Sequence, residues 1–209
     1  MKTSHSVNPS KKECILVEAA KAFARFGFRK ASIDEIAKEA GVGKGTVYLA
    51  AASKEDLYYQ VLHREIRAWQ SECARASDPR VPAYQLLGQL LGLSLQRLGS
   101  RPLVTELLQG DSFRLLPDWA ERLAELRALG RANLVEVLKL GVRQGVFAKE
   151  LEVETVAALL QDFQLSAWVA RPAGITPGEV VHRAKVGLSL VLDGLRARPT
   201  SAEALPALP

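Results

Sequence analysis

The chain has 209 residues, of which 48% are apolar, so it can bury a full core as one domain or as two small ones. No apolar run approaches the ~18 residues needed to cross a bilayer, and the small share of aromatic residues (6%) favours helix over strand. The net charge of +5 is compatible with an anionic partner. It is uneven, because the first sixty residues hold ten Lys or Arg against seven Asp or Glu, which leaves +3 there and +2 in the other 149.

The chain is predicted to open with a disordered arm over residues 1–9, followed by a helix. Ser10 and Glu13 form a capping-box pattern that starts this helix, and Gly27 ends it. Its buried side is predicted from helical spacing and consists of Ile15, Ala19, Ala22, Phe23 and Phe26. Phe28 lies beyond the stop, where it is expected to fold back onto the helices that follow.

The next stretch predicts two short helices separated by a glycine turn. Ser32 and Glu35 form a second capping-box pattern, and apolar residues then recur at the spacing of one buried helix face. Gly41 ends this helix, because a residue without Cβ adopts the left-handed cap conformation at little cost. A helix of about two turns follows over 44–50, and Ser53 caps a longer one. This order is the helix-turn-helix pattern, whose second helix reads a DNA major groove.

With the helix before it, this stretch resembles the DNA-binding domain of the TetR family of bacterial transcriptional regulators. The likeness is carried by Ile36–Ala37, Ala40–Gly41–Val42, Gly45–Thr46–Val47–Tyr48, Ser53–Lys54–Glu55 and Leu57. It implies an all-α protein with an N-terminal three-helix helix-turn-helix DNA-binding domain and a larger C-terminal helical domain for ligand binding and dimerisation. The chain departs from the family at Leu49–Ala50–Ala51, where the family usually carries aromatic residues after the tyrosine.

The resemblance implies a function as well as a fold. It implies a ligand-responsive repressor that binds a palindromic double-stranded DNA operator as a homodimer and is released by a small effector. Ala50 and Ala51 motivate a second hypothesis, a helical dimeric binding module that has weakened or lost DNA binding. A third hypothesis, an all-helical enzyme, has no residue in its favour.

Seven residues are predicted to form the DNA-contacting surface. The short helix is about 10 Å long and fits a major groove about 12 Å wide, while glycines let the backbone approach the DNA closely. The basic and hydroxyl-bearing side chains are candidates for phosphate or base contacts. The set is Ser32, Gly43, Lys44, Gly45, Thr46, Tyr48 and Lys54.

The remaining chain predicts helix after helix and no period-2 alternation of strands. The helix after Ser53 runs to about Ala76, some 22 residues or about 33 Å, and is long enough to join two bodies. We therefore divide the chain into a disordered arm, a helix-turn-helix domain, a linking helix shared by both domains, an effector-binding and dimerisation domain, and a flexible tail. Their bounds are 1–9, 10–52, 53–78, 79–198 and 199–209.

Further helices are predicted from proline, glycine and capping signals. They cover about 84–98, 102–109, 117–145, 152–169 and 177–196, and the last begins after the capping box of Thr176 and Glu179. The last two should pair antiparallel, and the resemblance implies that they pair again with their counterparts in a second subunit. The residues predicted to form this dimer interface are Val156, Leu160, Phe163, Ala184, Leu188, Val191, Leu192 and Leu195. The alternative is that these apolar stripes face only their own core.

The resemblance also implies a mainly apolar effector cavity in the C-terminal domain. The candidates for its walls and polar groups are Phe113, Trp119, Gln161, Asp162, Phe163 and Trp168. Aromatic residues at helical spacing are more often core than ligand site, so ordinary packing is the alternative. The identity of the effector is not encoded in any motif.

Other chemistry finds no support in the sequence. The segment 41–46 suggests a P-loop, but Lys38 stands where that motif needs its first glycine and Gly45 where it needs Ser or Thr. The three histidines and two cysteines show no metal-ligand spacing, and no catalytic grouping stands out, so we predict no metal, cofactor or enzymatic activity. Cys14 and Cys73 are predicted to be buried free thiols. With no signal peptide at its start, the protein is expected to be cytoplasmic and to have no membrane partner.

Overall fold

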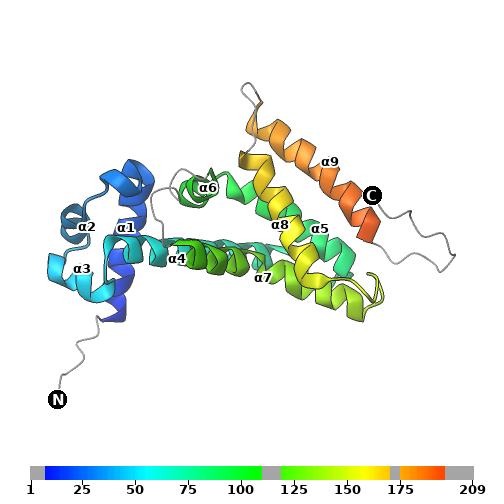
Figure 1. Cartoon of the computed structure of the whole chain (residues 1–209), viewed down its shortest axis with the longest axis horizontal. Coiled ribbons are helices and arrows are strands. Elements are labelled where there is room, and N and C mark those ends of the chain that lie inside the picture. The colour runs from blue at the N-terminus through cyan, green and yellow to red at the C-terminus, as the bar shows by residue number, and fades with distance from the viewer. Residues whose placement is uncertain (1–7, 110–118, 170–174, 196–209) are drawn as a thin grey trace, which may run out of the picture.

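The computed structural model describes residues 8–109, 119–169 and 175–195, and within these ranges the chain forms nine α-helices and no strand. The all-α class is therefore confirmed (Figure 1). The helices are α1 (Pro9–Lys30), α2 (Ile33–Glu39), α3 (Lys44–Ala50), α4 (Lys54–Ala76), α5 (Ala83–Leu98), α6 (Pro102–Gln109), α7 (Ala120–Arg143), α8 (Val153–Val169) and α9 (Pro177–Leu195). The predicted tail and most of the predicted arm lie outside the described residues.

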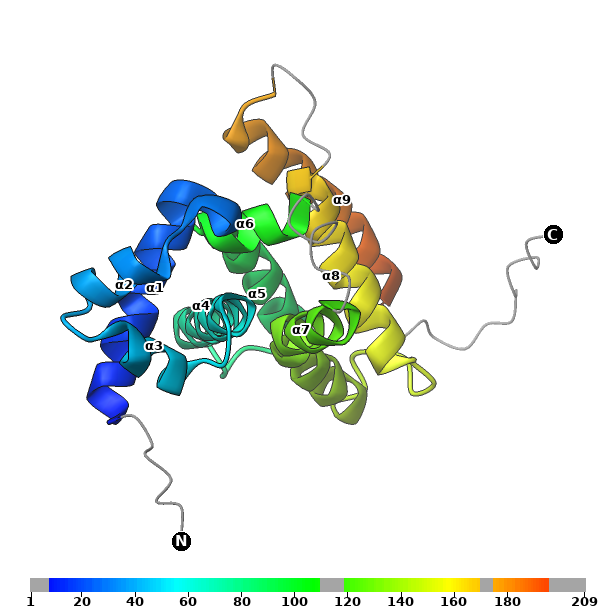
Figure 2. The ribbon, with the colours of Figure 1, turned by 60° about the vertical axis from the view of Figure 1, so that its left-hand side comes forward.

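Two bodies share one long helix. The helices α1, α2 and α3 pack on one another at one end of the molecule, and α4 runs from α1 into a second group formed by α5 to α9 (Figure 1). Seen from a second direction, α4 and α7 lie side by side between this amino-terminal head and the pair α8 and α9 (Figure 2). The predicted arrangement of a helix-turn-helix domain and a larger helical domain is confirmed.

The start of α1 differs from its prediction. The cap is Asn8, whose Oδ1 accepts a hydrogen bond from the backbone N–H of Ser10 at 3.0 Å, so Ser10 lies inside the helix. Pro9 explains the shift, because proline suits the first helical position, where no N–H partner is needed. Gly27 does interrupt the helix, with φ of 72°, but a short helical segment continues to Lys30.

The other capping signals behave differently from one another. Ser32 precedes α2 as predicted, but its side chain makes no cap hydrogen bond, so the capping box predicted there is wrong. Ser53 caps α4, with its Oγ accepting from the N–H of Asp56 at 3.1 Å. Before α9, Thr176 and Glu179 form both bonds of a capping box, at 3.2 and 3.0 Å. The bond from the backbone N–H of Thr176 to the carboxylate lowers the pKa of Glu179, since it favours the charged form.

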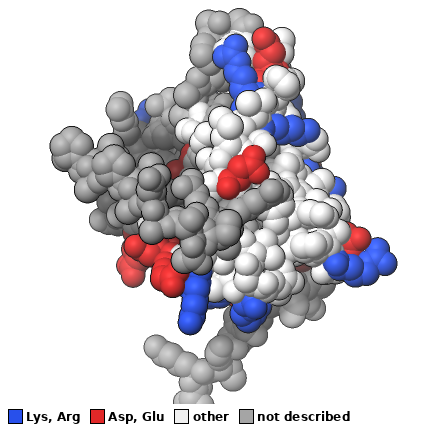
Figure 3. Space-filling model, turned by 90° about the vertical axis from the view of Figure 1, so that its right-hand side faces the viewer, with Lys and Arg blue, Asp and Glu red and all other residues white. Residues whose placement is uncertain are grey.

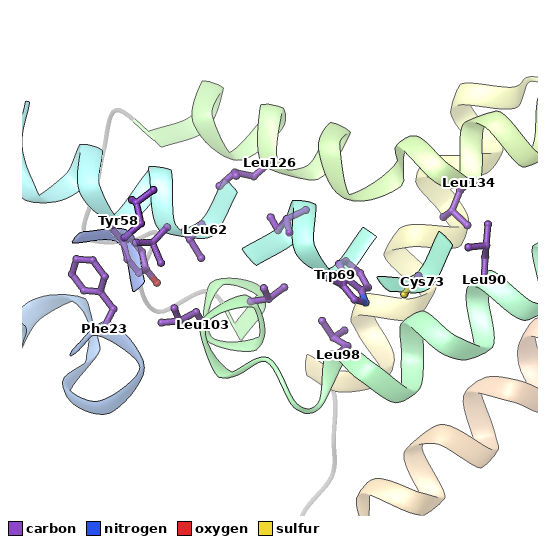
Figure 4. Close-up of a cluster of buried hydrophobic side chains, with 14 of the residues drawn as sticks. Phe23, Tyr58, Leu62, Trp69, Cys73, Leu90, Leu98, Leu103, Leu126 and Leu134 are labelled. Carbon is purple, nitrogen blue, oxygen red and sulfur yellow. The ribbon is translucent and has the colours of Figure 1, made fainter. Parts of the chain in front are cut away.

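The buried side chains form one continuous core that runs from the head into the body (Figure 4). The part of it that joins head and body comes from α1, α4, α5, α6 and α7 and includes Phe23, Tyr58, Leu62, Trp69, Leu90, Leu98, Leu103, Leu126 and Leu134. Because α4 contributes at both ends, the two bodies cannot separate without exposing apolar surface to water.

Aromatic rings fill the junction between the bodies. Tyr58 meets Phe23 edge-on with ring centroids 4.9 Å apart, and it lies 5.1 Å from Phe28 and 5.6 Å from Trp119. Phe28 thus folds back as predicted. The prediction for Phe26 is wrong, because this side chain is 40% exposed and lies under the guanidinium of the neighbouring arginine. Phe28, after the Gly27 break, therefore packs against Phe23 and Tyr58 in the place expected of Phe26.

The two cysteines differ in their surroundings. Cys73 is buried in α4 as predicted, and burial raises the pKa of its thiol. Cys14 is exposed, against the prediction, because its neighbours Ile15 and Leu16 occupy the inner face of α1. Within the described ranges, no group of His, Cys, Asp or Glu is arranged to hold a metal ion. None of the described helices is both long and apolar enough to cross a bilayer.

Because Cys14 is exposed and Cys73 is buried, we expect an alkylating reagent to modify only one of the two thiols. Iodoacetamide should modify one thiol per native chain, at Cys14, because a buried thiol with a raised pKa supplies little thiolate. Unfolding in guanidinium should expose Cys73 and give two modified thiols, counted by mass spectrometry of the peptides. Rapid native labelling of Cys73 would show that α4 opens readily in the folded protein.

Candidate nucleic-acid interface

A glycine turn sets the angle between α2 and α3. Gly41 has φ of 66°, the left-handed conformation predicted for the cap of α2. The N–H of Val42 then donates to the carbonyl of Ala37 at 3.0 Å, which satisfies one of the last carbonyls of the helix. Val47 is buried beneath α3 and holds it on the head. The opposite side of α3 faces away from the core.

The outward side of α3 carries the residues predicted to meet DNA. Lys44, Gly45 and Tyr48 are exposed, whereas Thr46 is half-buried. A Cβ placed at Gly43 or Gly45 would meet no atom within 4 Å, so these glycines are not required by packing inside the chain. They leave an open surface that a sugar-phosphate backbone can approach closely.

Two basic side chains of the predicted set already have partners within the chain. The Lys44 Nζ donates to Asp34 Oδ2 of α2 at 2.9 Å, and this hydrogen bond raises the pKa of Lys44. The Lys54 Nζ donates to the backbone carbonyl of Arg29 at 3.0 Å and lies 4.9 Å from the centroid of the Phe28 ring. Lys54 therefore ties α4 to the end of α1 and is less free than expected to reach a phosphate.

The carboxyl end of α3 is held by two residues that the sequence analysis did not select. The N–H of Ala52 donates to Asp56 Oδ2 at 3.0 Å, and the same oxygen accepts from Gln60 Nε2 at 3.1 Å. Gln60 Nε2 also donates to the carbonyl of Ala50, the last residue of α3, at 3.1 Å. Asp56 also receives the Ser53 cap through its own N–H, but no local pattern predicted the contact of Gln60.

The predicted effector residues do not form one site. Trp119 packs at the junction of the two bodies, and Asp162 forms an ion pair with Arg127 on the surface. The ring of Phe163 lies against α9, with its Cζ 2.5 Å from where a Cβ at Gly187 would be. Phe113 lies outside the described residues, as does the side chain of Trp168. Gln161 is buried, as Trp119 is, but it lies apart from Trp119 and donates to the carbonyl of Arg127 at 2.9 Å.

A cavity opens beside Gln161, between α4, α5, α7 and α8. Its empty volume is about 260 Å³ when its open mouth is included, but the enclosed part has room for only about one water molecule. The lining is more polar than predicted and holds no charged side chain. It consists of Gln70, Cys73, Leu90, Ser94, Gly130, Asn133, Leu134 and Gln164.

The predicted dimer residues fall into two groups. Leu160, Ala184, Leu188 and Leu192 are buried in the core of their own chain, so the alternative expectation holds for them. Val156, Phe163 and Leu195 are half-buried, and Val191 is exposed.

Other apolar side chains on α8 and α9 face outward. Leu190 is 72% exposed and Leu159 is 63% exposed, and Val186 lies one turn before Leu190 on α9. Figure 3 shows the end of the molecule that carries these helices, where uncharged surface lies between scattered charged side chains. Large apolar side chains exposed on neighbouring helices favour an interaction surface.

A compact helix-turn-helix head on a helical body is the architecture of a DNA-binding transcription regulator. The model of the bacterial regulatory proteins of the tetR family matches residues 15–61, which include α2, α3 and the turn between them. The amino-terminal head of the chain thus matches the TetR family, as the resemblance implied.

Full-length relatives extend the likeness beyond the head. The repressor KstR2 of Rhodococcus jostii is 29% identical over 184 residues, which cover 85% of this chain and 87% of KstR2. The repressor BepR of Brucella suis is 28% identical and covers 89% of this chain and 92% of its own length. The structure of FadR from Bacillus subtilis in complex with stearoyl-CoA superimposes with a TM-score of 0.69 over 88% of this chain and 99% of FadR, at 17% identity, which shows the shared fold.

Proposed function

We propose that the protein is a repressor that binds a palindromic operator as a homodimer and is released by a small effector. The observation that carries the proposal is the position of α4, which begins beside the recognition helix α3 and continues into the wall of the cavity. The proposal assigns residues 10–52 to DNA binding, 53–78 to the shared helix and 79–198 to effector binding and dimerisation.

The small enclosed volume of the cavity supports release by an effector. Any effector larger than a water molecule must push apart the helices that line the cavity, because the enclosed space is too small to admit it. One of these helices is α4, and its first turn holds the carboxyl end of α3 through Asp56 and Gln60. A ligand that separates the body helices therefore has a mechanical route to the recognition helix. FadR, which shares this fold, forms a complex with stearoyl-CoA, and this supports the proposal of a small-molecule effector.

The outward apolar surface supports dimerisation. Two recognition helices must reach half-sites about 34–36 Å apart, one turn of DNA, and one head alone contacts one half-site. Leu159, Val186, Leu190 and Val191 provide apolar contact area on the two helices farthest from the head. We therefore place the dimer contact on this outward surface of α8 and α9, which replaces the inward residues of the sequence prediction.

The proposed function is tested by DNA retention at two salt concentrations. The probe is the DNA that flanks the protein's own gene, with unrelated DNA of equal length as competitor. A sequence-preferring complex that weakens as salt rises is expected, because phosphate contacts release counterions. Absence of any complex at low salt would contradict the proposal and favour the module with weakened DNA binding.

The Lys44–Asp34 ion pair predicts opposite effects for its two members. Lys44→Ala should weaken operator binding and lower the salt slope by about one, as expected for a lost phosphate contact, or relax base preference if the side chain reads a base. Asp34→Asn should strengthen binding several-fold, since it releases Lys44 from its partner within the chain. Both are measured as dissociation constants over a salt series.

The controls separate local contact from net charge. Lys149→Ala removes the same charge at an exposed site that precedes α8 and should leave the salt slope nearly unchanged. Tyr48→Phe keeps the ring and removes only a hydroxyl that can reach a phosphate, so it should weaken all sequences alike. If Asp34→Asn weakened binding as much as Lys44→Ala does, the ion pair would be part of the DNA-binding geometry and not a competitor of it.

A further inference from the structure

The first turn of α7 lies against the first turn of α4, behind the end of the recognition helix. The Arg122 guanidinium carbon lies 4.9 Å from the centroid of the Tyr59 ring. The Tyr59 hydroxyl donates to Glu125 Oε2 at 2.5 Å, and this bond raises the pKa of the tyrosine. Trp119, just before α7, stacks on Tyr58. These contacts hold the start of α7 in a defined position on α4.

One contact of this junction leads to α3. Arg122 Nη2 lies 3.4 Å from Asp56 Oδ1, while the other oxygen of the same carboxylate accepts from the N–H of Ala52 and from Gln60. Gln60 completes the connection at the carbonyl of Ala50. The carboxylate of Asp56 therefore has α7 on one side and the end of the recognition helix on the other.

We propose that Arg122 is a positioning residue for DNA binding, which holds the Asp56 carboxylate in the orientation that fixes the carboxyl end of α3. The proposal deepens the proposed function and rests on operator binding by α3. It adds a direct connection from α7 to the recognition helix, alongside the route through α4.

The connection is suited to transmit movement rather than to stabilise the fold. Arg122 and Asp56 are both partly exposed, and ion pairs of this kind contribute little to global stability. The ion pair has a larger effect on the orientation of the Asp56 carboxylate. Because the two oxygens of one carboxylate move together, a change at Oδ1 also changes the position of Oδ2. If Arg122 shifts with α7, the bonds to Ala52 and Gln60 must lengthen or turn.

The same helix also reaches the cavity. Gly130, Asn133 and Leu134 of α7 line it, two to three turns beyond Arg122. No proline or break interrupts α7 between Arg122 and Leu134, so this part of the helix is expected to move together. A molecule that displaces the middle of α7 would then displace Arg122 as well, and the end of α3 would lose its fixed orientation.

The test uses Arg122→Met in the full-length chain, which keeps much of the aliphatic volume and removes the charge. Hydrogen exchange of the Ala52 amide should become about three- to tenfold faster, the range expected when one hydrogen bond is weakened. Operator affinity should fall by a similar factor, with thermal unfolding nearly unchanged. Arg127→Met is the matched control, because Arg127 lies on the same helix and pairs with Asp162 of α8. It should change neither measurement.

A double substitution tests the route through the carboxylate. In an Asp56→Asn background, Arg122→Met should add no further effect on Ala52 exchange or on operator affinity, because its partner is already neutral. Equal effects in both backgrounds, or exchange that rises evenly along α4 and α7, would overturn the proposal. Ala52 exchange requires no DNA, so a wild-type protein that binds no operator would refute the proposed function while the positioning of α3 by Arg122 is still decided.

Discussion

Leu190→Asp should convert a dimer into a monomer and reduce operator affinity by about 10²–10⁴-fold, since the two heads no longer act as one tethered pair. The leucine is 72% exposed in the single chain, so an aspartate there costs little in the monomer but places an unpaired charge in the proposed apolar contact. Sedimentation equilibrium gives the mass, to be compared with the 22.8 kDa of one chain, and a gel-shift titration gives the affinity.

Leu49→Asp provides an orthogonal control. Leu49 is another exposed leucine, but it lies on the recognition helix. Its substitution should abolish operator binding and leave the dimer mass unchanged. A Leu190→Asp protein that still sediments as a dimer would place the interface elsewhere.

Leu188 shows why the choice of residue matters. It lies two positions before Leu190, yet it is 4% exposed and belongs to the core of its own chain. A charge at Leu188 should unfold the C-terminal domain, and any loss of dimer mass would then report unfolding and not interface disruption. The two variants are distinguished by circular dichroism before any measurement of assembly.

Phe23→Ala should lower the free energy of unfolding by about 3–5 kcal/mol, the range for an aromatic side chain removed from a packed core. The ring is fully buried, and it contacts both Phe28 and Tyr58 at the junction of head and body (Figure 4). The loss should therefore loosen the position of the head on α4 as well as the head itself. Denaturant titration measures the change.

Phe26→Ala is the matched control, with the same substitution on the same helix three residues later. Its ring is 40% exposed, so less apolar surface returns to water and the expected loss is about 1 kcal/mol or less. Similar losses at both positions would mean that Phe26 is covered in the folded protein, for instance by a second copy of the chain.

Much of the fold was predictable because its signals are local. Proline, glycine and capping residues mark where helices begin and end within one or two turns of the chain, as at Gly41 and at Thr176 with Glu179. Ser10 and Ser32 show the limit of these signals. A serine followed by a glutamate three residues later is compatible with a capping box, but the neighbouring Asn8 and Pro9 decided the first case.

The candidate site was predictable in position but not in its internal contacts. The spacing of α2, turn and α3 located the recognition helix, because that geometry depends on residues near one another in sequence. The partners of Lys44 and Lys54 lie ten and twenty-five residues away, and the contact of Gln60 with Ala50 joins two helices. Such pairs depend on the angle between helices, which tertiary packing sets.

In the last two helices, the sequence determines that apolar sides exist, and the packing decides which of these sides faces the core. Helical periodicity predicted one apolar stripe of α9, and the structure buries four of its side chains but leaves Val191 exposed and Leu195 half-buried. The predicted stripe was Val180, Ala184, Leu188, Val191, Leu192 and Leu195. Val186, Leu190 and Val191 lie on another side of the same helix and are equally apolar, so hydrophobicity alone could not say which side faces inward. The approach of α5 and α8 decided it, because only one side of α9 can be covered by its own chain and the other is left for water or a partner.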